Sequence, residues 1–255
     1  MTHSDHELAA RLAELAGRRL LEIRATSGLE GKELGKRGDH DSNELLLAEL
    51  AAERPDDAVL SEESVDSPAR LSADRVWIID PLDGTREYGM PGRDDWAVHV
   101  ALWQRGQDAP AITAAAVAQP SLDTVYATHS VKLGSAGARS EIVVLVSDSR
   151  PPAFAADAAA AIGGVVRPMG SAGAKAMAVV RGDADAYVHA GGQWEWDSAA
   201  PVGVALAAGL HASRVDGSPL VYNEAHPYLP DLLICRPEFA TPLLDAIRDA
   251  LPHSE

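Results

Sequence analysis

Two stretches near the start of the chain repeat apolar residues at intervals of three and four, the spacing of a helix that buries one face. The first stretch predicts a helix over residues 7–24, and the second predicts one over residues 41–53, with Pro55 soon after its end. The apolar positions of the first helix are Leu8, Leu12, Leu15, Leu20 and Ile23. Those of the second are Leu45, Leu46, Leu47 and Leu50.

Short apolar runs of strand length follow the two helices. They cover residues 58–60, 76–79, 96–103, 114–117 and 124–126. Within residues 96–103, the larger side chains Trp96, Val98, Val100 and Leu102 alternate with the rest. Alternation with a period of two indicates a strand that packs one face on a core. The first half of the chain therefore predicts two helices against an antiparallel sheet.

The rhythm changes after a segment rich in Gly, Ala and Ser at residues 131–140, which we take as the boundary between two units, 1–137 and 138–255. Beyond it, strands and helices alternate, so we expect an α/β half with helices on a mixed sheet. The predicted strands are 141–146, 165–166 and 186–188, and the predicted helices are 152–161, 172–181 and 198–208. Gly209 closes the last helix.

Charge and composition exclude several classes of function. The formal net charge of −16 repels nucleic acid polymers and anionic membrane surfaces. The single cysteine, Cys235, forms no internal disulfide and follows an apolar run typical of a buried strand. We find neither a secretory leader nor an apolar run long enough to span a membrane, so we expect a cytoplasmic protein. A carboxylate cluster that binds divalent cations would still allow such an acidic protein to bind a small phosphorylated molecule.

The strongest chemical signal is the segment Asp80-Pro-Leu-Asp83-Gly-Thr85, directly after the predicted strand 76–79. Pro81 and Gly84 favour a tight turn that places both carboxylates on one side, with the amides of Gly84 and Thr85 beside them. Hard oxygen ligands of this kind suit Mg²⁺. An Asp-Gly pair on its own is more often an ordinary turn. Glu62, after the strand 58–60, and Asp197, before the helix 198–208, are similarly weak signals when taken alone.

Together, these acidic segments resemble the three signature motifs of the inositol monophosphatase superfamily, in the same order. The motifs are Ser61-Glu62-Glu63-Ser64, Asp80-Pro-Leu-Asp83-Gly-Thr85 and Trp196-Asp197-Ser-Ala-Ala200. The superfamily comprises lithium-sensitive, magnesium-dependent phosphatases, and the resemblance covers essentially the whole chain. It implies a layered αβαβα sandwich of the inositol monophosphatase and fructose-1,6-bisphosphatase type, in agreement with the α/β pattern above.

The resemblance also implies a role for each motif residue. Two to three Mg²⁺ ions would be held by Glu62, Asp80, Asp83, Asp197 and the backbone carbonyl of Leu82. Thr85 would hold the attacking water together with an upstream aspartate, either Asp39 or Asp41, and ungapped matching favours Asp39. Glu62 would belong to the catalytic set as well. The reacting phosphate would meet Asp83, Gly84, Thr85 and Asp197, and the occupied metal site would carry a net positive charge.

Smaller features of the sequence indicate the substrate. Glu87, in the stretch Asp83-Gly-Thr-Arg-Glu87, and the segment Gly170-Ser171-Ala-Gly-Ala-Lys175 resemble bisphosphate nucleotidases of the CysQ type. In that group the second segment lines the nucleotide pocket, so Gly170, Ser171 and Lys175 become candidate substrate contacts; Lys175 as a solvated helix residue is an equal alternative. The strand residues Tyr187-Val-His189 stand where nucleotidases commonly carry Arg.

The function that we expect is hydrolysis of 3′-phosphoadenosine 5′-phosphate to AMP and phosphate, in sulfate assimilation. Inositol monophosphatase or fructose-1,6-bisphosphatase activity is the alternative within the superfamily. A non-catalytic metal- or nucleotide-sensing protein is the alternative from a different class, although all the motif residues are present. The partner is then a small phosphorylated metabolite, and a homodimer is the one assembly that we consider.

Overall fold

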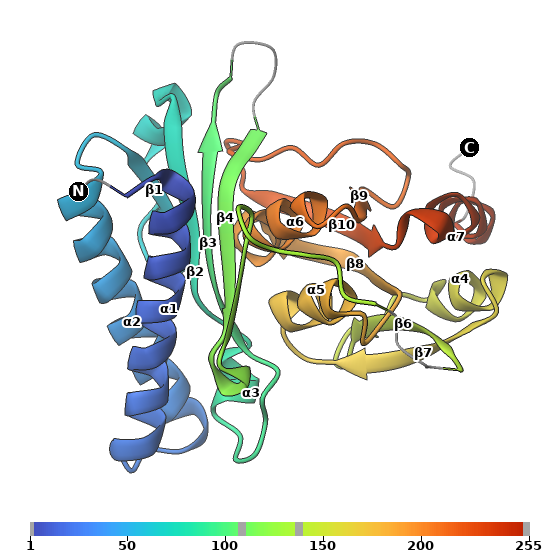
Figure 1. Cartoon of the computed structure of the whole chain (residues 1–255), viewed down its shortest axis with the longest axis horizontal. Coiled ribbons are helices and arrows are strands. Elements are labelled where there is room, and N and C mark those ends of the chain that lie inside the picture. Colours follow the sequence, from blue (N-terminus) through green and yellow to red (C-terminus); the bar gives the residue numbers. More distant parts are fainter. Residues whose placement is uncertain (1–2, 107–110, 136–139, 252–255) are drawn as a thin grey trace.

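The computed structural model describes residues 3–106, 111–135 and 140–251, and it places two long helices at the start of the chain. Helix α1 (Asp5–Thr26) begins at a capping box between Ser4 and Glu7. Helix α2 (Gly31–Glu53) packs beside it, and together they form the outer layer at the left of Figure 1. Their apolar faces bury Leu8, Leu12, Leu20, Leu46 and Leu50 against the first sheet.

The first sheet has five strands in the order β1-β2-β3-β4-β5. Its strands are β1 (Ala58–Ser61), β2 (Arg75–Asp83), β3 (Ala97–Gln104), β4 (Ala111–Gln119) and β5 (Thr124–Ala127). Short 3₁₀ turns at Pro68–Ser72 and Pro120–Leu122 connect parts of it. Strands β1 and β2 pair in parallel, whereas the other pairs are antiparallel. The prediction of a purely antiparallel first sheet was therefore wrong at β1.

The second half supplies the other three layers, and Figure 1 shows all five in succession from α1 and α2 to α7. Helices α5 (Ala172–Arg181) and α6 (Glu195–Ala207) lie between the two sheets. The second sheet has the order β7-β6-β8-β10-β9. Its strands are β6 (Ile142–Ser147), β7 (Gly164–Met169), β8 (Ala186–Trp194), β9 (His211–Ser213) and β10 (Tyr228–Cys235). Helices α4 (Ala155–Ala161) and α7 (Pro237–Ala250) cover its far face.

This arrangement confirms the predicted αβαβα sandwich and explains one departure from the predicted pattern. In β3, Val98, Val100 and Leu102 join the core beneath α1 and α2. The intervening Ala97, Ala101 and Trp103 join the core beneath α5 and α6. Because both faces of the first sheet are covered, β3 is buried from Ala97 to Trp103, and alternation reflects side-chain size rather than exposure.

Element ends differ from the sequence-based prediction in several places. Helix α2 begins at Gly31 rather than Asp41, and α6 begins at Glu195 rather than Ser198. Strand β2 continues through Pro81 to Asp83 instead of ending at Ile79. Cys235 is buried at the end of β10, as expected for a structural thiol. The boundary predicted between residues 137 and 138 lies outside the described residues. Among the residues that the structure describes, no helix has the length and apolar character needed to cross a membrane.

Candidate active site

The end of β2 brings the motif carboxylates together. The pairing of β2 with β3 shifts register between Asp80 and Asp83, so both side chains lie on the same side of the sheet edge. Gly84 follows with φ of 85°, a left-handed conformation that glycine adopts without strain. A Cβ atom at Gly84 would also lie only 3.0 Å from Ser171 Cβ. The short helix α3 (Thr85–Tyr88) then starts directly at the site.

Three carboxylates form a cluster in which the imidazole of His99 faces two of them, Asp80 and Asp83. Asp80, Asp83 and Asp197 each offer an oxygen, and these oxygens all lie within 4.8 Å of one another. Asp80 Oδ1 accepts a hydrogen bond from Leu82 N at 3.0 Å, but its buried Oδ2 has no hydrogen-bond partner among the described residues. Burial and the neighbouring carboxylates raise the pKa of Asp80 well above its usual range and that of Asp197 to about 6. A buried, partly unpartnered oxygen cluster fits a divalent cation.

Asp83 differs from the other two because the second half of the protein holds it. Its carboxylate accepts hydrogen bonds from Ser171 Oγ and from the amides of Ala172 (3.2 Å) and Gly173 (2.6 Å), at the start of α5. His99 Nε2 lies 3.2 Å from Asp83 Oδ2, and His99 Nδ1 lies 3.0 Å from the carbonyl oxygen of Trp196. Burial alone would raise the pKa of Asp83, but His99 and these donors outweigh it and lower the pKa to about 2.

Glu62 lies at the margin of the cluster. Its side chain is exposed in the loop after β1, and it is not among the three residues whose oxygens gather within 4.8 Å. Nevertheless, desolvation of its carboxylate and the charges of Asp197 and Glu63 raise its pKa to about 8. The structure therefore places Glu62 within the electrostatic reach of the cluster, which suits a ligand on its solvent side.

Thr85 and Asp39 form the hydrogen-bonded pair that the resemblance implies. Thr85 Oγ1 lies 3.1 Å from Asp39 Oδ1 and 3.2 Å from the carbonyl oxygen of Leu82, so its hydrogen has two acceptors. Burial and the charge of Glu63 raise the pKa of Asp39 to about 7. Asp41 is instead held by Arg19 at 2.7 Å and by Arg37 at 2.7 Å. Of the two aspartates considered, only Asp39 lies beside Thr85.

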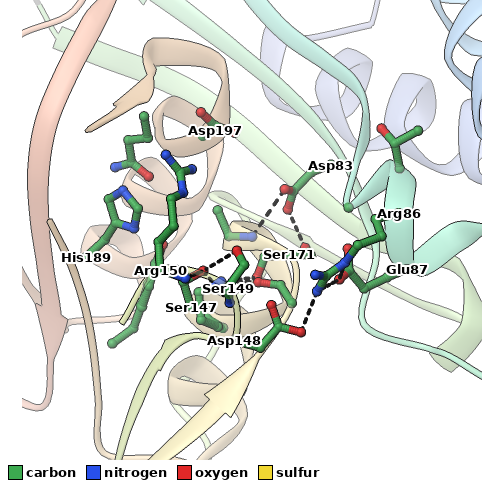
Figure 2. A pocket seen from close by; sticks show the side chains of 17 residues that line it. Asp83, Arg86, Glu87, Ser147, Asp148, Ser149, Arg150, Ser171, His189 and Asp197 are labelled. Atoms are coloured by element: carbon green, nitrogen blue, oxygen red, sulfur yellow. Dashed lines mark hydrogen bonds and ion pairs between the residues drawn. The ribbon is translucent and has the colours of Figure 1, made fainter. Parts of the chain in front are cut away.

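A pocket of about 320 Å³ opens beside Asp83, Thr85 and Asp197 (Figure 2). Its walls come from both halves of the protein, because the loop after β6 and the residues before α5 face α3 across it. The three candidate substrate contacts Gly170, Ser171 and Lys175 all line it. A Cβ atom at Gly170 would lie 2.5 Å from Glu87 Cγ, so the two motif segments fit together only with glycine there. Lys175 is 3% exposed, and its alternative interpretation as a solvated lysine was wrong.

Several groups around the pocket were not identified from the sequence. Arg150, Asp148 and Ser147 come from the loop after β6, which has no motif to mark it. The contacts of His99 with Asp83 and with the carbonyl oxygen of Trp196 are those of a structural histidine. The sequence gives no local signal for its contact with Asp83, which arises because β3 pairs with β2 and brings His99 beside Asp80 and Asp83.

Some residues near the motifs do not line the pocket. Trp194 and Trp196 stack on each other with ring centroids 5.4 Å apart, and neither lines the pocket beside Asp83. Their closeness to Asp197 in the sequence therefore does not make them part of its wall. Arg93 forms an ion pair with Asp95 in the loop between α3 and β3, with Arg93 Nε 2.6 Å from Asp95 Oδ1.

The fold and the carboxylate cluster define the chain as a metal-dependent phosphatase of the layered α/β class. The model of the inositol monophosphatase family matches residues 1–231, and the chain belongs to this family. The family resemblance seen in the three motifs is thereby confirmed.

Relatives and solved structures agree with this assignment. The chain is 58% identical to the 3′-phosphoadenosine 5′-phosphate phosphatase of Mycobacterium bovis over 240 residues, covering 92% of this chain and 90% of that protein. It is 30% identical over 206 residues to the 3′(2′),5′-bisphosphate nucleotidase CysQ of Escherichia coli K12, covering 75% and 80%. The fold matches inositol monophosphatase II of Staphylococcus aureus with a TM-score of 0.77 at 20% identity, covering 97% and 98%.

Proposed function

We propose that the chain hydrolyses 3′-phosphoadenosine 5′-phosphate to AMP and phosphate with Mg²⁺, in sulfate assimilation. The observation that carries this proposal is the 58% identity, over nearly the full length, to a phosphatase named for that substrate. The buried carboxylate cluster beside a pocket lined by residues of both halves supports the same reaction class.

Residues of this chain would hold two to three Mg²⁺ ions. The ligands would be Asp80, Asp83, Asp197, Glu62 and the carbonyl oxygen of Leu82. Asp80 Oδ2 supports this set, because it is buried, accepts no hydrogen bond and lies 3.9 Å from its one ion-pair partner among the described residues, His99 Nδ1. When bound, Mg²⁺ neutralises phosphate charge, lowers the pKa of water and stabilises the leaving oxygen.

Thr85 and Asp39 would orient the attacking water. When Thr85 Oγ1 donates its hydrogen to Asp39, its lone pairs can accept a hydrogen bond from water. Asp39, with a pKa raised to about 7, would take up the proton that the water loses. Gly84 permits the turn that brings Thr85 to the cluster, and Gly170 permits the close approach of the opposite wall.

The amides at the start of α5 and the Ser171 hydroxyl are engaged by Asp83 in the structure. They would therefore contribute to the reaction mainly by fixing the orientation of Asp83, a proposed metal ligand. Asp83 and Asp197 would face the reacting phosphate through the ions that they hold.

A substrate comparison tests the proposed activity. Phosphate release by the purified chain with Mg²⁺ would be measured for 3′-phosphoadenosine 5′-phosphate, inositol 1-phosphate and fructose 1,6-bisphosphate. We expect kcat/KM to be highest for the nucleotide. A preference for inositol 1-phosphate or fructose 1,6-bisphosphate would contradict the substrate and leave the reaction class intact. Absence of hydrolysis, with metal or nucleotide still bound, would favour the non-catalytic sensing protein.

The remaining proposals concern partners and location. We expect a cytoplasmic enzyme that acts on a small phosphorylated metabolite and binds neither nucleic acid polymers nor membranes, in keeping with its net charge of −16. A homodimer is the proposed assembly, and sedimentation at several protein concentrations would test it. A mass equal to one chain of 26.8 kDa at all concentrations would contradict it.

A further inference from the structure

Three strongly basic side chains line the pocket, and two of them are committed to partners within the protein. The three are Arg86, Arg150 and Lys175. Arg86 forms ion pairs with Glu87 and with Asp148 across the pocket (Figure 2). These two carboxylates neutralise its charge, and they surround the guanidinium with acceptors. Arg86 therefore connects the two walls of the pocket and has little capacity left for an anion.

Lys175 is committed even more fully. Its Nζ donates to the carbonyl oxygens of Gly170, of Ser171 at 2.9 Å and of Met169 at 3.4 Å. An ammonium group has three donors, and these contacts use them all. The same Nζ lies 5.0 Å from the centroid of the Tyr187 ring. Lys175 thus fastens the turn before α5, and its ammonium is not available to a phosphate.

Arg150 differs from both. It follows β6 in the loop that forms one wall of the pocket, and its side chain is exposed. Its backbone N donates to Ser147 Oγ at 3.2 Å, which fixes the loop, but its guanidinium forms no hydrogen bond or ion pair with any residue that the structure describes. Figure 2 shows this side chain on the same side of the pocket as His189. A guanidinium without a protein partner on the wall of a phosphate pocket is available to bind an anionic group of a ligand.

The position of Arg150 suits one particular anion. The carboxylate cluster belongs to the end of β2 and the start of α6, whereas Arg150 belongs to the second sheet, on another wall of the same pocket. A substrate with a single phosphate at the cluster leaves Arg150 without a partner. A nucleoside bisphosphate has a second phosphate that stays intact during the reaction, and a guanidinium can bind it with two parallel hydrogen bonds.

We propose that Arg150 binds the phosphate that is not hydrolysed and thereby selects bisphosphates over monophosphates. The inference rests on the proposed nucleotidase function, and it assigns to Arg150 the substrate contact that the sequence suggested for Lys175. It also accounts for the absence of an arginine in the stretch Tyr187-Val-His189, because the charge comes instead from the loop after β6.

The test uses Arg150→Gln, Arg150→Lys and the matched control Arg167→Gln. Arg167 is an exposed arginine of β7 that pairs with Glu141 and does not line the pocket. For each protein, kcat and KM would be measured with 3′-phosphoadenosine 5′-phosphate and with 3′-AMP, which lacks the second phosphate. Thermal unfolding would confirm that each variant is folded.

We expect Arg150→Gln to raise KM for the bisphosphate about tenfold or more, the usual effect of losing a hydrogen-bonded charge pair. The kcat/KM ratio of bisphosphate to 3′-AMP should fall by a similar factor. Arg150→Lys should recover part of the ratio, and Arg167→Gln should leave it unchanged. An unchanged ratio in Arg150→Gln, or equal losses on both substrates, would overturn the proposal. Failure of the wild-type chain to hydrolyse the bisphosphate would instead overturn the proposed function itself.

Discussion

Two glycines of α2, Gly35 and Gly38, allow the helix to approach the end of β2. We expect substitution of Gly35 to lower mainly the catalytic rate and substitution of Gly38 to lower mainly the stability of the fold. Gly35 faces Thr85: a Cβ atom there would lie 2.6 Å from Thr85 Cγ2 and 3.3 Å from the Thr85 carbonyl oxygen. Gly38 faces the core: a Cβ atom there would lie 2.8 Å from Tyr88 Cε1 and 2.9 Å from Leu82 Cδ2. The two substitutions to alanine are chemically identical and lie one turn apart.

The size of each effect follows from these distances. Ordinary contact begins at 3.4 Å, so Gly35→Ala requires Thr85 to move by about 0.8 Å. Such a movement away from α2 would stretch the 3.1 Å contact between Thr85 Oγ1 and Asp39 Oδ1 beyond hydrogen-bonding distance. A misplacement of about 1 Å can cost about 100-fold in rate, so we expect kcat to fall between about 10- and 100-fold. Overpacking costs about 1–3 kcal/mol, and the better helix propensity of alanine offsets about 1 kcal/mol of this.

Gly38→Ala should show the opposite balance. Its contacts are with buried side chains, including Leu20 at 3.1 Å, so the cost falls on core packing. We expect the free energy of unfolding to fall by about 2 kcal/mol, or about 4–8 °C in Tm, with kcat within about threefold of the wild type.

Phosphate release under saturating substrate gives kcat, and thermal unfolding gives the stability of the same samples. Lys36→Ala, at an exposed position between the two glycines, is the control for substitution in this helix. Wild-type kcat in Gly35→Ala would refute the reasoning, as would equal ratios of rate loss to stability loss in the two glycine variants.

Three further predictions test the cluster, the water-binding pair and the acid stability of the fold. Asp80→Asn should abolish hydrolysis and the rise in Tm on adding Mg²⁺, yet raise the Tm of the metal-free protein, because it removes a buried carboxylate whose Oδ2 accepts no hydrogen bond. The control is Asp94→Asn, at an exposed aspartate outside the carboxylate cluster, and a lower metal-free Tm in Asp80→Asn would contradict this prediction. Thr85→Val should lower kcat about 100- to 10,000-fold while the Mg²⁺-induced rise in Tm persists. Loss of the activity together with loss of the rise in Tm would show that Thr85 acts on metal binding instead. Asp5 is partly buried, which opposes its ionisation, but Arg75 and Arg54 outweigh this and lower its pKa below 3.8. Because its folded-state pKa is lowered, Asp5→Asn should destabilise the protein by up to about 1 kcal/mol at pH 7, and the difference from the wild type should vanish as the pH falls below 3.8. Urea unfolding of both proteins across this pH range is the test, and a difference that persists at acid pH would refute the prediction.

The limits of prediction from the sequence are clearest in α2. The leucines at 45–50 predicted its second half, whereas its first half contains Gly31, Gly35 and Gly38, which disfavour a helix in isolation. Gly35 and Gly38 are required because a Cβ atom at either position would lie too close to Thr85, or to Leu82 and Tyr88. No local sequence pattern encodes these tertiary contacts. As a result, Asp39 fell outside the predicted helix, although it lies in a helix whose rigidity positions it against Thr85.

The three motifs were sufficient to predict that Asp80, Asp83 and Asp197 form one cluster, because their residue types and order are specific. The partners of these carboxylates could not be predicted in the same way. His99 reaches Asp83 from β3, and Ser171 reaches it from the start of α5. The first contact depends on the pairing of β2 with β3, and the second joins residues 88 positions apart in the sequence. A single sequence records these residues but not their pairing.

Asp83 also explains how the two halves of the site depend on each other. Its carboxylate is fixed by the first amides of α5, and Arg86 is fixed by Asp148 of the loop after β6. Both contacts cross from the first sheet to the second half, and they lie beside the phosphate pocket. A ligand in the pocket must therefore contact groups whose positions depend on how the first sheet packs against the second half of the chain. Three carboxylates share the single imidazole of His99, and the guanidinium of Arg150 has no partner among the described residues, so the protein's own side chains leave both walls without full charge balance. Cations at one wall and an anionic group at the other would supply it together, which is the combination that a magnesium-bound bisphosphate provides.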